Sequence, residues 1–116
     1  MAFIRIRATT LVFAALSLAA CNDSNTTECG GSVSGALQDG TELHVGGQFN
    51  NGQPVLTLTK SGSPHILVAS DYNNSGATFD LTGLAPGIYT ATWEISCNEG
   101  GLKSLDGSKV PTVTVN

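Results

Sequence analysis

Basic side chains are scarce in this sequence. Its two arginines lie within the first seven residues, and its only lysines are Lys60, Lys103 and Lys109. From Cys21 onward, these three lysines stand against nine acidic residues, which gives a formal charge of −6. Nucleic-acid binding needs a basic footprint, so the composition excludes a nucleic-acid partner. The acidity suits a domain held away from an anionic membrane surface.

Metal-ligating side chains are also few. His44 and His65 are the only histidines, and the only methionine is residue 1, which excludes a methionine-rich copper site. A metal site would have to pair these histidines with Glu42 or Asp71, without any characteristic ligand spacing. We therefore interpret both histidines as surface residues and predict no metal and no cofactor.

The sequence lacks a recognisable catalytic constellation. No nucleophile elbow is present, and Ser61 and Ser63 flank a glycine in "KSGSPH", which is typical of a hairpin turn. A paired-carboxylate site at Glu94 would need a second acid, for which Asp80 is the candidate. We predict that the protein has no catalytic residues and is not an enzyme.

No segment after residue 30 has a sustained helical period, and all 14 glycines lie beyond residue 20. Instead, short apolar–polar alternations are separated at roughly ten-residue intervals by turn clusters such as "QDG", "NNGQP", "SGSP" and "APG". This pattern predicts one all-β domain, an Ig-like or prealbumin-like sandwich of about seven strands. The predicted strands are Ser32–Leu37, Thr41–Phe49, Val55–Lys60, His65–Ser70, Ala77–Thr82, Ile88–Cys97 and Val110–Val115.

The segment Ile88–Cys97 has the clearest alternation. Tyr89, Trp93 and Cys97 share one face with Ala91 and Ile95, while threonines and Glu94 occupy the other. We expect the aromatic face to point into the core. The side chain of Cys97, the last residue of this strand, would then also point toward the core.

The first twenty residues have the layout of a signal peptide. Arg5 and Arg7 precede an apolar stretch from Ala8 to Ala20 that ends in small residues. The stretch is shorter than the ~20 apolar residues of a membrane span. A short buried helix is the alternative interpretation, but the charged flank favours an export signal.

The four residues Leu18-Ala19-Ala20-Cys21 resemble the lipobox of bacterial lipoproteins. The resemblance implies a lipid on the Cys21 sulfur, cleavage just before it and attachment to a membrane of the cell envelope. Asn22 rather than Asp follows the cysteine, which by the same resemblance implies the outer membrane. The alternative is an ordinary signal peptide followed by a structural cysteine.

If Cys21 carries lipid, two cysteines remain. An even number in an exported chain predicts a Cys29–Cys97 disulfide, and a small domain gains most from such a crosslink. A pair of thiols in a metal site is the alternative, but no histidine or cysteine lies at short spacing from either residue. The predicted organisation is a signal peptide at 1–20, a lipidated cysteine and polar tether at 21–30, and a β sandwich at 31–116.

The stretch "FDLTGLAPGIYTATW", residues 79 to 93, resembles the turn-and-strand signature of prealbumin-like and Cna-B-like sandwiches. In that signature a leucine precedes a Pro-Gly turn and an aromatic opens the next strand. The matching residues are Leu84, Pro86, Gly87 and Tyr89. The resemblance implies a fold and not a function.

The loop "SDYNNSGA" has the composition of an adaptable binding surface, with an aromatic ring, amides and a carboxylate. Its candidate binding residues are Asp71, Tyr72, Asn73 and Asn74; a polar hairpin loop is the simpler interpretation. We predict a lipid-anchored envelope protein whose β domain binds or scaffolds an envelope protein or glycan. A periplasmic hydrolase inhibitor and a carbohydrate-binding module are the alternatives.

Overall fold

The computed structural model describes residues 28–116. The predicted signal peptide, Cys21 and the predicted tether up to residue 27 lie outside the described residues. Every element of the described chain is a β-strand, so no helix there is long and apolar enough to cross a membrane. The strands are β1 (Gly30–Asp39), β2 (Glu42–Asn50), β3 (Gly52–Lys60), β4 (Ser63–Val68), β5 (Asp71–Tyr72), β6 (Gly76–Asp80), β7 (Gly87–Cys97), β8 (Leu102–Ser104) and β9 (Thr112–Val115).

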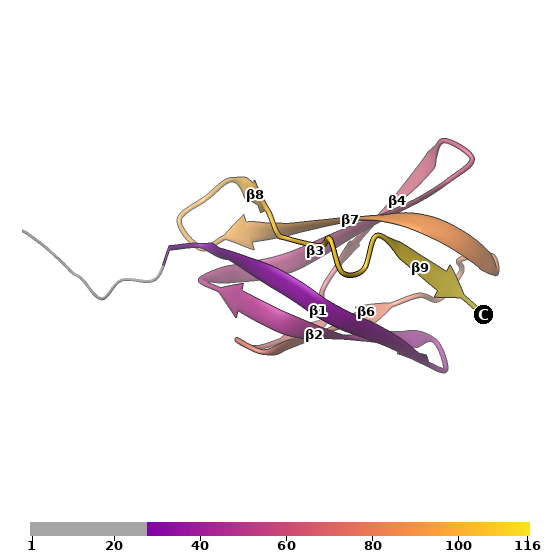
Figure 1. The fold of residues 1–116 in the computed structure, drawn as a ribbon, viewed down its shortest axis with the longest axis horizontal. Coiled ribbons are helices and arrows are strands. Elements are labelled where there is room, and N and C mark those ends of the chain that lie inside the picture. Colours follow the sequence, from indigo (N-terminus) through magenta and orange to yellow (C-terminus); the bar gives the residue numbers. More distant parts are fainter. Residues whose placement is uncertain (1–27) are drawn as a thin grey trace, which may run out of the picture.

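The strands form two antiparallel sheets packed face to face (Figure 1). One sheet has the order β1-β2-β6-β5. The other has the order β4-β3-β7-β8, with β9 also pairing with β7. The predicted all-β sandwich is therefore confirmed, with all seven predicted strands present.

Two strands, β5 and β8, were not predicted. Each has only two or three residues, too few for an apolar–polar alternation to be detected. Strand β3 also begins earlier than predicted, because Pro54 lies inside it rather than in the preceding turn. The missing N–H of Pro54 costs little here, since its partner strand β4 ends at this point and only the Ala69 N–H reaches the Pro54 carbonyl.

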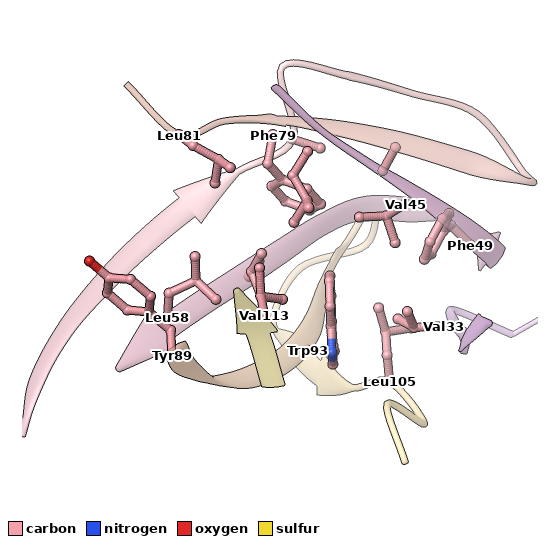
Figure 2. Packing of buried hydrophobic residues seen from close by; sticks show 14 of the residues in the cluster. Val33, Val45, Phe49, Leu58, Phe79, Leu81, Tyr89, Trp93, Leu105 and Val113 are labelled. Carbon is pink, nitrogen blue, oxygen red and sulfur yellow. The ribbon is translucent and has the colours of Figure 1, made fainter. Parts of the chain in front are cut away.

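The core lies between the sheets and is built largely from alternate residues of the strands β2, β3, β6, β7 and β9 (Figure 2). Leu56 and Leu58 of β3 and Ile95 of β7 have no exposed surface. Phe79 from the opposite sheet meets Trp93 edge-on, with ring centroids 6.1 Å apart. The predicted inward face of β7 is confirmed for Tyr89 and Trp93, which are 2 % and 4 % exposed.

The irregular segment 105–111 closes one side of the sandwich. The Leu105 N–H donates to the Trp93 carbonyl in one sheet, while the Val33 N–H donates to the Asp106 carbonyl from the other. Gly107 lies directly against the Trp93 indole, and a Cβ at this position would overlap the ring. A glycine is needed here because the backbone passes so close to a large side chain.

The sandwich has two ends, which we call the Cys29 pole and the far pole. The Cys29 pole contains the start of the described chain, the β2–β3 turn and the β7–β8 turn; the C-terminus lies at the far pole (Figure 1). The β3–β4 hairpin projects from the body of the sandwich in this view. Its turn residues Ser61 and Gly62 both have positive φ, as a tight type I′ hairpin requires.

Candidate functional site

The Cys29 pole is fixed by the predicted disulfide. Cys29, just before β1, is bonded to Cys97 at the end of β7, with 5.7 Å between the two Cα atoms. The prediction of this bond is confirmed, and it joins residues 68 positions apart. The bond links the first strand of one sheet to the central strand of the other. It therefore holds the entry point of the domain against the core.

A hollow of about 540 Å³ lies beside the disulfide. The residues around it are Glu28, Cys29, Asn51, Cys97, Asn98, Glu99, Gly100 and Lys103. Lys103 Nζ lies 3.9 Å from the Glu28 carboxylate, but both side chains are largely exposed, so this ion pair adds little stability. Three of its eight lining residues are charged: Glu28, Glu99 and Lys103.

The predicted binding loop also lies at the Cys29 pole. Asp71 and Tyr72 form the short strand β5, and the turn that follows is organised by Asn73. The Asn73 side-chain oxygen accepts hydrogen bonds from the backbone N–H groups of Ser75 and Gly76, each at 2.9 Å. This oxygen is therefore committed to shaping the turn.

The same loop is held against the neighbouring strand β2. The Phe49 N–H donates to the Asn74 carbonyl at 2.9 Å, and the Gly47 N–H donates to the Ser75 carbonyl at 3.2 Å. The loop is a fixed surface and does not project as an arm. Tyr72 remains 44 % exposed, beside a small hollow of about 160 Å³ that Asn73, Asn74 and Asn98 also line.

The two histidines lie on different sheets. His44 points outward from β2, with its Nε2 3.4 Å from the Glu42 carboxylate. His65 lies on β4 and meets the Tyr89 ring edge-on at 6.2 Å. Asp71 shares the outer face of the first sheet with His44 and Glu42. Within residues 28–116, however, no three His, Cys, Asp or Glu side chains lie close enough together to hold a metal ion.

Asp80 and Glu94, the two acids considered as a possible pair, do not meet. Asp80 ends β6 on the outer face of one sheet, whereas Glu94 lies on β7 in the other sheet. Asp80 instead organises its own turn. The Thr82 hydroxyl and then the Thr82 backbone N–H donate to its carboxylate, at 2.6 and 2.9 Å, and hold the pKa of Asp80 below its usual value.

Tyr89 anchors the turn that precedes β7. Its hydroxyl donates to the Ala85 carbonyl at 2.6 Å, and Lys60 Nζ lies 5.6 Å from the centre of its ring. Lys60 also donates to the Pro86 carbonyl at 3.0 Å. These contacts fix the turn before β7 at the far pole.

Strand β4 was predicted from the sequence, but its position at an open edge of the sheet was not. Its position at the end of a sheet could not be read from the sequence, because strand order depends on long-range pairing. The available signal was "SPHILV", an apolar strand segment without a charged side chain.

Comparison of the chain with protein families, with curated proteins and with solved structures found no match.

Proposed function

We propose that this protein is a bacterial envelope lipoprotein, anchored by lipid on Cys21, whose β domain is a non-enzymatic binding or scaffold module. One observation supports the anchor above all. The chain has three cysteines, and the Cys29–Cys97 disulfide uses two of them, which leaves Cys21 outside that bond. Cys21 is also the cysteine that ends the lipobox-like sequence, so its sulfur is the one available for acylation.

The geometry of the Cys29 pole fits this proposal. The described chain enters the domain beside the disulfide, so the lipid on Cys21 would lie within ~30 Å of this pole for a fully extended connection. Several acyl chains on one residue give stable membrane attachment, whereas a single chain binds only marginally. The Cys29 pole would then lie close to the membrane surface.

Metabolic labelling with a palmitate analogue tests the anchor. We expect the full chain, expressed in a bacterium, to take up label and to sediment with membranes. Cys21→Ala should abolish both properties, while the matched control Cys29→Ala should retain the label. Unlabelled wild-type chain, or label that persists in Cys21→Ala, would contradict the proposal.

A carbohydrate ligand is the second candidate function, and Tyr72 favours it. Sugar binding commonly uses an exposed aromatic ring beside polar groups, and Tyr72 lies 44 % exposed near the amides of Asn74 and Asn98. The hydrolase-inhibitor alternative would need a projecting loop, and the 71–76 loop is held against β2.

Glycan-array binding of the full chain tests the second candidate. Tyr72→Ala should lose any glycan signal. Ile88→Ala removes a more exposed apolar side chain, 68 % exposed at the start of β7, and should keep the signal. Equal signals from both variants would rule out the Tyr72 surface as the sugar site.

A further inference from the structure

Strand β4 is an open sheet edge. It ends the five-stranded sheet, with β3 on one side and, among residues 28–116, no strand on the other. The edge of β1 is different: Asp106 bridges to Ser32, and the Asn116 N–H donates to Gln38 Oε1 at 2.9 Å. The edge strand β5 has only two residues. Of the sheet edges in residues 28–116, the six-residue β4 is thus the longest without such a cover.

The backbone groups on the open side of β4 can be assigned from the register. The Ala69 N–H donates to the Pro54 carbonyl, and Val68 is paired with Val55. Hydrogen-bonded and non-hydrogen-bonded pairs alternate along antiparallel strands. The N–H and C=O groups of Leu67 therefore face β3, and those of Ile66 and Val68 face away from it.

The side chains of β4 do not protect this edge. Ile66 and Val68 are 69 % and 52 % exposed, and the strand has no Asp, Glu, Lys or Arg. Natural edge strands are usually blunted by charges, proline, bulges or short length. Of these protective features, β4 has only a proline, Pro64, which removes one outward-facing N–H near the hairpin tip. The edge from His65 to Val68 remains open.

We propose that β4 pairs antiparallel with β4 of a second copy of this chain, so that the two five-stranded sheets join. The register that avoids Pro64 places Ile66 opposite Val68 of the second copy. Because both residues direct their backbone groups outward, each such pair exchanges both of its N–H···O bonds. Leu67 then lies opposite Leu67 of the second copy, on the two-fold axis.

This register is self-complementary in its side chains as well. Ile66 meets Val68 of the second copy on the outer face of the sheet, and the two Leu67 side chains meet on the inner face. No like charges oppose each other, although the chain as a whole is acidic. A second copy therefore fits the edge in both backbone bonding and side-chain character.

The interface is small. Two six-residue strands bury far less than the ~1,600 Å² of a standard protein interface, so the dimer should be weak in dilute solution and favoured where the chains are concentrated. The two Cys29 poles point in opposite directions in this dimer. If the chains are lipid-anchored as proposed above, the paired strands would lie along the membrane surface.

Cysteine crosslinking of the full chain in bacterial membranes tests the pairing. Leu67→Cys places two thiols on the two-fold axis at a non-hydrogen-bonded pair, where the Cα atoms are ~4.5 Å apart, within the range of a disulfide. We expect mild oxidation to give a covalent dimer. The control is Ile88→Cys. Ile88 is 68 % exposed, more than the half-buried Leu67, so exposure of the thiol alone would give more crosslinking in the control.

A second substitution separates edge pairing from chance collision. Ile66→Pro removes an N–H that faces away from β3, so it should leave the Cys29–Cys97 disulfide and the fold intact. In the Leu67→Cys background it should lower the dimer fraction about tenfold, the effect of losing two hydrogen bonds. No dimer from Leu67→Cys, equal crosslinking by Ile88→Cys, no effect of Ile66→Pro, or an adduct with a different protein would each overturn the proposal.

Discussion

The Trp93 indole N–H donates a hydrogen bond to the Val110 carbonyl at 2.8 Å. This contact joins the central strand β7 to the irregular segment 105–111, which also bonds to β1. Trp93 thereby acts both as the largest side chain of the core and as a tie to the segment that closes the sandwich (Figure 2). Because it is the only tryptophan, its fluorescence reports directly on this closure.

Trp93→Phe should destabilise the domain by about 2–4 kcal/mol, because it removes the bond to Val110 and leaves space in the core. Urea unfolding followed by circular dichroism measures the change. Tyr72→Phe, which removes a hydroxyl from a partly exposed ring, should leave the midpoint nearly unchanged. A Trp93→Phe midpoint equal to that of the wild type would show that the segment 105–111 does not depend on the indole.

Gly107→Ala should destabilise the domain by about 1–3 kcal/mol, because the added methyl group overlaps the Trp93 ring and the backbone must shift. Gly35→Ala is the matched control: it lies on β1, where an added Cβ would meet no atom within 4 Å, and it should be close to neutral. Tryptophan fluorescence during urea unfolding compares the two. Similar midpoints for the two variants would contradict the close packing at Gly107.

Removal of the disulfide should cost about 2–5 kcal/mol, because the bond closes a loop of 68 residues and limits the unfolded chain. The double variant Cys29→Ser/Cys97→Ser should therefore unfold at lower urea concentration, as should the wild type in reductant. Cys21→Ala serves as the control and should unfold like the wild type. A reductant-insensitive midpoint would be inconsistent with a stabilising bond.

Asp80 and Asp106 should both titrate below the usual aspartate range. The Ser108 hydroxyl, and then its backbone N–H, hold the pKa of Asp106 down as Thr82 does for Asp80. Since the folded-state pKa is lowered, the stabilisation is present above the unfolded value of about 3.9 and is lost as the pH falls through the folded value. Carbon-13 NMR of the carboxyl groups measures both values.

Thr82→Val tests the cause of the Asp80 shift. It removes the hydroxyl donor, the larger cause, and keeps the backbone N–H, so the pKa of Asp80 should rise part of the way to its usual value. Asp106 is the internal control and should not move, because its donors come from Ser108. An unchanged Asp80 titration would exclude the hydroxyl as the cause.

Much of the fold could be predicted because single-strand alternation is a local signal. The alternation of Ile88–Cys97 placed Tyr89 and Trp93 in the core, and the parity of Cys97 agreed with its pairing to Cys29. The clusters "QDG" and "SGSP" marked real turns at Gly40 and Gly62, both of which have positive φ. These features depend on neighbours within a few residues.

The features that were missed depend on long-range contacts. Strand β5 exists because Asp71 and Tyr72 pair with β6, and the segment 105–111 is held by bonds to Trp93 and Val33. The candidate loop was predicted correctly as a turn, but the internal hydrogen bonds of Asn73 were not predicted. Local composition shows which polar groups such a loop contains. It does not show which of them already form hydrogen bonds within the fold.

The Cys29–Cys97 bond also determines how the domain responds to mechanical load. A pull on the chain ahead of Cys29, with the C-terminus held, passes through the sulfur atoms to Cys97, the last residue of β7, and from there into the chain that follows it. The residues between the two cysteines are excluded from the path of the force and do not extend. Only the chain after Cys97, which includes β8 and β9, is stretched. The disulfide thus prevents a force on the two chain ends from separating the strands β1 to β7 one after another.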